Sequence, residues 1–257
     1  MRKILAMVTV LALMVCCGAA SADTFIQGID PEYNPFSYMG DNGEYTGFDV
    51  EICKAACEVA GLDYQVFAVN WDNKLVQLDA GECDVIWSGM TIADTMKEAG
   101  YVISAPYYDS SQVLVVRKDS GIETSADLAG KVVAVQLGTS GEALLNGDLS
   151  ALKDTFQELV TTENFLMAFT ELEGGAVDAV FVDSPVAENY VSGKDSLKIL
   201  DETLGAEQYG LACRAGDEEL CAKIEAAVQT LVENGTYAEI AAKYPGIVNN
   251  LLFLNAK

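Results

Sequence analysis

The stretch Leu78–Gly89, LDAGECDVIWSG, has a counterpart at Leu172–Asp183, LEGGAVDAVFVD. In each stretch a leucine is followed by a glycine three positions on, an aspartate six positions on and then an apolar run. This pattern is typical of a helix end, a turn and a buried strand. Two such units far apart in the chain predict two α/β lobes. Ligands of open α/β sheets lie beyond the carboxyl ends of strands, so two strand ends that face each other would form a cleft.

Apolar periodicity in the rest of the chain also predicts an α/β fold, with helices alternating with strands. The runs QVLVVRK (112–118) and KVVAVQL (131–137) are typical of buried strands. Three helices are indicated by apolar faces that end before a glycine. The faces are Phe48, Ile52, Ala55, Ala56 and Val59 before Gly61; Leu75 and Leu78 before Gly81; and Leu220, Ile224, Ala227, Val228 and Leu231 before Gly235.

The first 22 residues have the pattern of a secretory signal peptide. Two basic residues precede an apolar run, and the segment ends in Ala20-Ser21-Ala22, which is an A-x-A cleavage site. Cleavage there would start the mature chain at Asp23. Cys16 and Cys17 raise lipoprotein anchoring as an alternative, but neither follows the small residue that such cleavage prefers. No later run approaches the roughly 20 apolar residues of a membrane-spanning helix.

The charge of the chain excludes several classes of partner. Aspartate and glutamate number 39 against 15 lysines and arginines, for a net charge of -24. Such a protein repels nucleic acid and anionic membrane surfaces. The sequence contains no histidine and no C-x-x-C motif, so we expect neither a metal site nor thioredoxin-type chemistry, and no cofactor. It contains no Walker A motif, so any ATP hydrolysis would belong to a partner.

Five cysteines follow the signal segment, and an exported protein can keep disulfides. Cys213 and Cys221 close a short loop and could pair. Cys83 could pair with Cys53 or with Cys57, which would leave one free thiol.

Two segments of the second lobe carry groups suited to a small polar ligand. In QLGTSGE, residues 138–141 would present backbone N–H groups at a helix N-terminus, which suits a carboxylate. The alternative is an ordinary Gly/Ser turn with a serine cap. Asp183 ends a strand before Ser184-Pro185, and its carboxylate could hold an ammonium group. The alternative for Asp183 is simple helix capping.

In the first lobe, the loop GIDPEYNPF contains Asp30, Tyr33 and Phe36. We expect Tyr33 to flank a ligand and Phe36 to lie in the core. Trp71, before a helix, could be a hydrophobic staple or a cleft wall. In SGMTIADTMK the small residues and hydroxyl after an apolar strand would let a ligand approach the backbone.

Taken in order, these segments resemble the periplasmic solute-binding proteins of polar amino-acid ABC transporters, the family 3 extracellular solute-binding proteins. The matching stretches are GIDPEYNPFSY, GEYTGFDVEI, WDNKLVQLDAGECDVIWSGMTI, APYYDSSQVLVV, DLAGKVVAVQLGTSGE, VDAVFVDSP, QYGLAC and NGTYAEIAAKY. The resemblance covers nearly all of the mature chain.

The resemblance implies a type II periplasmic-binding fold, in which two lobes joined by two crossover hinge strands close around one small solute. QVLVVRK and EQYGLACR would be the crossovers. Residues 1–22 would be the signal peptide, 23–113 plus 210–257 lobe 1, and 114–209 lobe 2. The protein would be a periplasmic monomer without catalytic activity that delivers an amino acid or an analogue to a membrane permease.

The resemblance also implies roles for individual positions. Tyr33 and Trp71 would be aromatic walls; Ser88, Gly89 and Thr91 the strand end that receives the ligand's ammonium and carboxylate; Thr139 and Ser140 carboxylate donors; Asp183 the acid that holds the α-ammonium; and Asp30 a contact for a cationic side chain.

One position departs from the family pattern. Counting from Met90, the residue where the family usually has an arginine that clamps the ligand carboxylate is Met96. Lys97 is adjacent, but on a helix it points about 100° away. Either the carboxylate rests on Thr91, Thr139 and backbone N–H groups, or the ligand's anion lies elsewhere or is missing. Since acids outnumber cations among the cleft candidates, we expect a neutral or cationic ligand.

The alternative function is an enzyme on the same fold, similar to cyclohexadienyl or arogenate dehydratases. Such chemistry needs a positioned acid or base, and Asp183 or Glu142 could serve. Neither is paired in the sequence with a general base or a metal site, so a binding protein is favoured. A third reading, the sensor module of a receptor, lacks a transmembrane segment in support.

Overall fold

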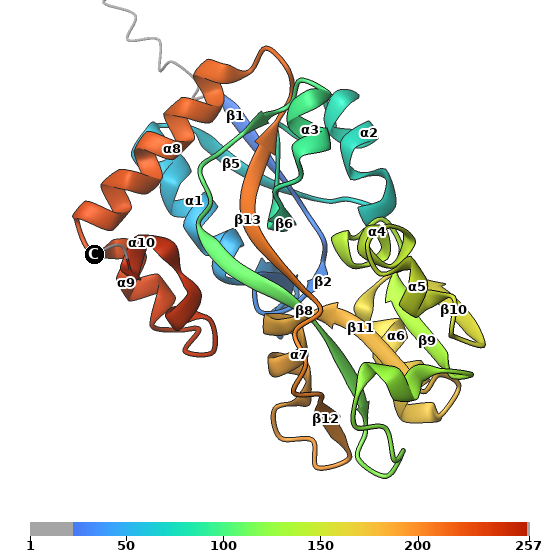
Figure 1. The fold of residues 1–257 in the computed structure, drawn as a ribbon. Helices are drawn as coiled ribbons and strands as arrows, with labels where there is room; N and C mark the ends of the chain where they lie inside the picture. The colour runs from blue at the N-terminus through green and yellow to red at the C-terminus, as the bar shows by residue number, and fades with distance from the viewer. Residues whose placement is uncertain (1–22, 256–257) are drawn as a thin grey trace, which may run out of the picture.

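One ten-stranded mixed sheet runs through the whole molecule, and its central strands β8 and β13 join two lobes (Figure 1). The structure is a computed structural model that describes residues 23–255, so the predicted signal peptide lies outside the described residues. The strand order is β10 (Glu158–Thr162), β9 (Val132–Gln136), β11 (Ala179–Asp183), β8 (Tyr108–Arg117), β13 (Gly205–Cys213), β6 (Val85–Thr91), β1 (Thr24–Ile29) and β5 (Asp63–Ala68).

Two short strands are added to the large sheet, and three more form a second sheet. β12 (Leu197–Ile199) pairs with β8, and β7 (Val102–Ile103) pairs with β13. A separate three-stranded sheet is formed by β2 (Glu32–Tyr33), β3 (Ser37–Met39) and β4 (Tyr45–Thr46).

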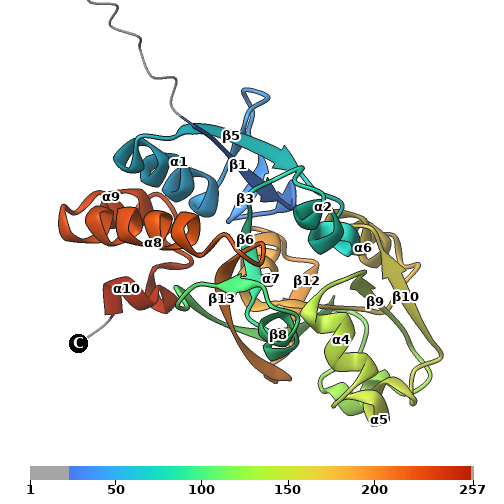
Figure 2. The same ribbon diagram turned by 90° about the horizontal axis from the view of Figure 1, so that it is seen from above.

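Helices cover both faces of each lobe. Lobe 1 has α1 (Phe48–Ala60), η1 (Trp71–Asn73), α2 (Lys74–Asp79), α3 (Asp94–Glu98), α8 (Glu218–Glu233), α9 (Thr236–Ala241), η3 (Val248–Asn250) and α10 (Leu252–Asn255); lobe 2 has η2 (Ser125–Leu128), α4 (Ser140–Asn146), α5 (Ser150–Lys153), α6 (Phe165–Gly174) and α7 (Ser184–Val191). Figure 2 shows α1 and α8 side by side, with α2 on the other side of β1 and β6.

Each lobe contains a parallel set of strands, and each of the two repeated stretches ends in one strand of its set. β5, β1 and β6 are parallel in lobe 1, and β10, β9 and β11 are parallel in lobe 2. β8 runs antiparallel to β11, and β13 runs antiparallel to both β8 and β6. The predicted α/β fold with two lobes and two crossover strands is confirmed. The proposed boundaries at 113/114 and 209/210 fall inside β8 and β13, and they stay a prediction.

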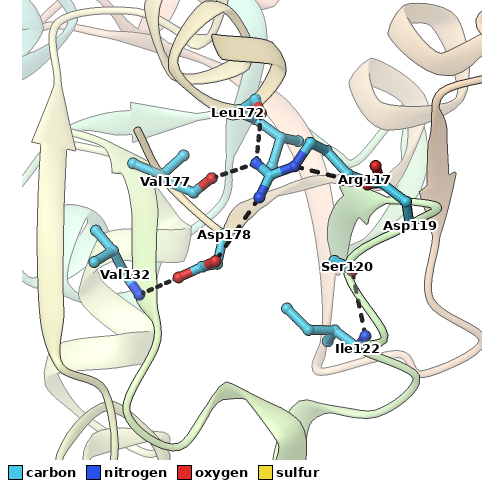
Figure 3. Close-up of polar contacts among 8 residues, drawn as sticks. All are labelled: Arg117, Asp119, Ser120, Ile122, Val132, Leu172, Val177 and Asp178. Atoms are coloured by element: carbon cyan, nitrogen blue, oxygen red, sulfur yellow. Dashed lines mark hydrogen bonds and ion pairs between the residues drawn. The ribbon is translucent and has the colours of Figure 1, made fainter. Parts of the chain in front are cut away.

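The two repeated stretches form the same local structure in both lobes, and an arginine binds each of them. Figure 3 shows the Arg117 guanidinium, at the end of β8, between the backbone carbonyls of Leu172 and Val177 and the carboxylate of Asp178. Its Nη1 donates to the two carbonyl oxygens at 2.7 and 2.8 Å. The other carboxylate oxygen of Asp178 accepts a hydrogen bond from the backbone N–H of Val132.

Arg214, directly after β13, makes the equivalent set of contacts in lobe 1. Its Nη1 donates to the carbonyls of Leu78 and Cys83, and its Nη2 donates to Asp84 at 3.0 Å. Asp84 in turn accepts from the backbone N–H of Ile26. The bound positions are the first, sixth and seventh of the repeated stretch in both lobes. Each crossover strand is therefore anchored to its lobe by one arginine.

The sheet divides the core into separate apolar clusters. The cysteines of one predicted disulfide lie in different clusters. Cys53 and Cys57 lie in the large apolar cluster beneath α1 and α8. Cys83 lies in a different cluster with Trp71 and Leu78 on the α2 side, with its sulfur close to Gly28 of β1. Since strand β1 separates the two clusters, the predicted pairing of Cys83 with Cys53 or Cys57 is wrong.

The other predicted pair, Cys213 and Cys221, is in contact but forms no disulfide. All five cysteines within residues 23–255 are free thiols. The Cys213 and Cys221 thiols hydrogen-bond to each other, as do those of Cys53 and Cys57.

Among the described helices, none is long and apolar enough to cross a bilayer.

Removing either anchoring arginine should destabilise the protein. Arg117→Ala and Arg214→Ala each remove hydrogen bonds from a charged group to buried carbonyls and leave an aspartate without its cation. Hydrogen bonds of this kind contribute about 1.5–3 kcal/mol each, and the side chains are about a quarter exposed, so we expect a loss of roughly 2–3 kcal/mol in the free energy of unfolding. Urea denaturation followed by circular dichroism measures the loss.

The matched control is Lys97→Ala, which removes an exposed ion pair with Asp94 at 3.5 Å. Exposed pairs of this kind contribute less than about 1 kcal/mol. If the two arginine variants are no less stable than this control, the anchoring role is wrong.

Candidate ligand-binding site

A cavity of about 200 Å³ lies between the two lobes. It is bounded by β6 and the start of α2 on lobe 1 and by the N-terminal turn of α4 and the end of β11 on lobe 2. Eight of the ten positions predicted from the sequence line it: Tyr33, Trp71, Gly89, Thr91, Met96, Thr139, Ser140 and Asp183. The other lining residues are Lys74, Leu75, Met90, Ala93, Gly138 and Ala143.

The lobes touch each other around this cavity, so the conformation is closed. Gln136 of lobe 2 donates through Nε2 to Asp30 of lobe 1 at 2.7 Å. Lys74 of lobe 1 donates through Nζ to the carbonyl of Gly138 in lobe 2, also at 2.7 Å. Gly138 has φ of +74°, and a Cβ built on it would lie 2.5 Å from the Cα of Asp72. Only a glycine allows the lobes to approach this closely.

Asp30 and Ser88 support the site from behind and do not line the cavity. Asp30 is 4 % exposed, and its carboxylate accepts from Gln136 and from the backbone N–H of Glu32. Burial raises its pKa. Ser88 is fully buried, and its hydroxyl accepts from the backbone N–H of Asp30. The predicted contact between Asp30 and a cationic ligand side chain would therefore require Gln136 to move.

The end of β6 is shaped by Gly89, which the Tyr33 ring approaches closely; the approach of a ligand to this backbone stays a prediction. Gly89 has φ of +55°, and a Cβ there would lie 2.1 Å from the ring of Tyr33. Its backbone N–H donates at 2.7 Å to Asp49, which lies in the first turn of α1 and also accepts from the Tyr107 hydroxyl. Burial raises the pKa of Asp49 to about 7. Thus α1 and β6 are tied together directly behind the cavity.

Asp183 faces the cavity and does not cap the helix that follows it. Its side chain makes no capping hydrogen bond, although Pro185 lies in the first turn of α7. The carboxylate is 4 % exposed and accepts from Gln112 Nε2 at 2.6 Å and from the Tyr33 hydroxyl. Burial, followed by the nearby carboxylate of Glu207, raises its pKa well above the ordinary value.

The predicted anion site at residues 138–141 is partly used by the protein itself. The Thr139 hydroxyl accepts from Glu142 N and donates to the carbonyl of Gln136, so it serves as the cap of α4. The backbone N–H of Gly138 donates to the Glu142 carboxylate at 2.7 Å. Ser140 lines the cavity, and its hydroxyl donates to Glu207 at 2.8 Å.

Met96 and Lys97 lie where helix geometry predicts. Met96 is 8 % exposed, lines the cavity and packs in the apolar cluster that contains Trp71. Lys97 is exposed and pairs with Asp94. The wall that carries Met96 therefore presents a thioether and no cation.

Lys74 is a cavity residue that the sequence reasoning missed. Its Nζ donates to the carbonyls of Trp71 and Gly138 and lies 4.7 Å from the centre of the Trp71 ring. Burial lowers its pKa to about 8. Its position three residues after Trp71, at a helix start, is the signal that could have placed it beside the indole.

Gln112 and Glu207 were also missed, because both lie on the crossover strands rather than on loops. Gln112 Nε2 donates to Asp183 and, at 3.0 Å, to Glu207. Glu207 accepts from Thr91 of lobe 1 at 2.7 Å as well as from Ser140 of lobe 2. Alternation along β13 places Glu207 and Tyr209 on one face, which is the signal in the sequence.

The comparisons with known proteins agree with this geometry. The family described as bacterial extracellular solute-binding proteins, family 3, matches residues 25–247. The L-cystine-binding protein of Escherichia coli is 31 % identical over 226 residues, which is 87 % of this chain and 83 % of that protein.

Solved structures show the same fold. A substrate-binding protein of an ABC uptake transporter from Streptococcus pneumoniae with bound histidine has a TM-score of 0.81 and 28 % identity, covering 86 % of this chain and 91 % of its own. An ancestral amino-acid-binding protein described as a precursor of cyclohexadienyl dehydratase has a TM-score of 0.77 and 33 % identity, covering 86 % and 94 %. The chain belongs to the bacterial extracellular solute-binding proteins, family 3.

Proposed function

We propose that this protein is the solute-binding component of an ABC importer. It is exported to the periplasm through the signal peptide at residues 1–22, captures an amino acid or an amino-acid-like solute, and delivers it to a membrane permease as a monomer. The family and the ligands named for its relatives, cystine and histidine, support an amino-acid-like solute.

The observation that carries the proposal is the environment of Asp183. A carboxylate that is 4 % exposed faces a cavity between two lobes, and its partners among the described residues are the neutral donors Gln112 and Tyr33 and the carboxyl group of Glu207, none of which is a cation. A buried charge is stable only when it is paired with an opposite charge. A solute ammonium group placed in the cavity supplies this partner through charge-assisted hydrogen bonds.

Hinge closure is the mechanism that the contacts between lobes support. The hydrogen bonds from Gln136 to Asp30 and from Lys74 to Gly138 form only when the lobes are together. A solute that contacts both lobes binds the closed state more tightly than the open one, and so shifts the population toward closure.

The dehydratase alternative has weaker support. Glu142, one of its two candidate acids, does not line the cavity and is held by the backbone N–H of Gly138. The ancestral relative is itself described as an amino-acid-binding protein. A binding protein is the better reading of the site.

Replacing Asp183 tests the ammonium site. Asp183→Asn should weaken binding of the solute at least about 100-fold, because the solute's ammonium would be buried without its counter-charge. A thermal-shift screen of the twenty amino acids identifies the solute, and isothermal titration calorimetry measures affinity. Asp195→Asn, an exposed change in the same lobe, is the control. Equal affinity of Asp183→Asn and wild type would contradict the proposal.

Affinity should also depend on pH. An ammonium group binds the ionised form of Asp183, whose pKa is raised well above 3.8 by burial and Glu207; the other titratable groups that face it are Tyr33 and Tyr209. Lowering the pH through that raised pKa should therefore weaken binding progressively, because the carboxyl group becomes neutral. In the solute-free protein the sign is opposite: the raised pKa stabilises the fold at acid pH, and this contribution is lost as the pH rises through that pKa. Isothermal titration calorimetry at a series of pH values measures this change in affinity. An affinity that does not change with pH would contradict the assignment of Asp183 as the ammonium site.

Closure can be tested at Gly138. Gly138→Ala would place a methyl group against the Asp72 backbone, so it should prevent full closure and weaken binding about tenfold or more. Gly175→Ala is a matched control, since Gly175 has φ of +76° and its Cβ would meet no atom within 4 Å. Both variants should lose similar stability to backbone strain, while Gly138→Ala alone loses affinity. The same affinity in both variants would show that the lobes need not meet at Gly138.

A further inference from the structure

The carboxylate of Glu207 occupies a position between the lobes that is built to receive an anion. The Thr91 hydroxyl of lobe 1 and the Ser140 hydroxyl of lobe 2 both donate to its Oε2, at 2.7 and 2.8 Å. The side-chain amide of Gln112 donates to its Oε1 at 3.0 Å. Three neutral donors from three separate segments therefore converge on one carboxylate, which the protein itself supplies from strand β13.

This position is part of the solute site. Thr91, Ser140 and Asp183 line the cavity, and Gln112 bridges the carboxylates of Glu207 and Asp183 with one amide nitrogen. On its outer side Glu207 lines a surface hollow together with Asp94, Lys97 and Asp109. A solute carboxylate directed at Thr91 and Ser140 would meet the Glu207 carboxylate on the same donors and would be repelled by it.

We propose that Glu207 is a specificity-determining residue that replaces the solute's carboxylate, so that the site prefers a cationic solute whose carboxyl group is absent or neutralised. The inference rests on the proposed function, because it presupposes that the cavity binds a small solute. It narrows the solute from amino acids in general to amines and amides derived from them.

The charges around the cavity agree with this class of solute. Lys74 is the basic side chain that lines the cavity within residues 23–255, and its ammonium is bound to the carbonyls of Trp71 and Gly138. The acids Asp72, Asp30 and Glu142 already act on its charge. Met96, which packs in the same apolar cluster as Trp71, offers no donor. The Asp183 carboxylate therefore remains for the cationic end of a solute, while the Glu207 carboxylate takes the place of the solute's own anion.

The test compares solutes that differ only at the carboxyl group. L-Arginine, L-argininamide and agmatine form one series, and L-lysine, L-lysinamide and cadaverine form another. In the wild-type protein the amide or the amine should bind at least about tenfold more tightly than the parent amino acid, as measured by calorimetry. In Glu207→Gln the preference should shrink or reverse, since the repelling charge is gone while the side-chain shape is kept.

The matched control is Asp109→Asn, which removes one negative charge from the neighbouring crossover strand. Asp109 is exposed, pairs with Gln208 and contacts neither Thr91 nor Ser140. The Asp109→Asn variant should prefer the amide or amine over the parent amino acid to the same extent as the wild type. Parent amino acids that bind as tightly as their amides, with no change in Glu207→Gln, would overturn the inference and leave the proposed function standing. If none of these solutes and none of the twenty amino acids binds, the proposed function fails and the inference fails with it.

A second measurement tests the anion position without the natural solute. Glu207→Ala vacates the donors of Thr91, Ser140 and Gln112, so acetate should raise the melting temperature of this variant. Acetate should leave the melting temperatures of the wild type and of Asp109→Ala unchanged. Equal responses of the three proteins to acetate would show that these donors do not hold a free carboxylate, and that would overturn the inference.

Discussion

The fold depends on one interaction that occurs twice: an arginine at the end of a crossover strand binds the carbonyls and the aspartate of a helix–turn–strand unit. Arg117 fixes β8 to lobe 2, and Arg214 fixes β13 to lobe 1. Because the anchors lie at opposite ends of the antiparallel pair, the segment between them is where the lobes can turn relative to each other. That segment pairs Gly205–Tyr209 with Tyr108–Gln112.

The same segment carries the polar groups that organise the cavity. Gln112, Glu207 and Tyr209 all project from it, and the Tyr209 hydroxyl lies 2.7 Å from that of Tyr33, which binds Asp183. Recognition and hinge motion therefore share residues. If the lobes turn about this segment, Gln112 and Glu207 move relative to Thr91 and Ser140, so we expect the donors of each lobe to be brought together only in the closed state.

Much of this was predictable from the sequence, and the failures have physical reasons. The repeated Leu–Gly–Asp stretch predicted both lobes because turns and buried strands have strong local signals, and the small residues at 88 and 89 indicated a close approach to the backbone. The close contact of Gly138 with Asp72 was not predicted. The arginine anchors escaped prediction because their partners are backbone carbonyls, which no side-chain pattern reveals. The predicted partner of Cys83 was wrong because spacing along the chain does not show on which side of the sheet a side chain lies. Eight of the ten predicted site residues line the cavity, while Asp30 and Ser88 lie one layer behind it.

Met96, at the position where the resemblance to the family implies an arginine, and the presence of Glu207 are best understood together. A carboxylate bound by neutral hydroxyl and amide donors needs no arginine when it belongs to the protein, since closing the hinge already positions it. A free solute carboxylate would have to lose its hydration and its mobility to reach the same donors. The Glu207 carboxylate has already lost most of its mobility because the residue belongs to β13. The hydrogen bonds to this carboxylate therefore help to hold the closed conformation. Binding energy from the solute is then needed mainly at its cationic end, where Asp183 lies buried.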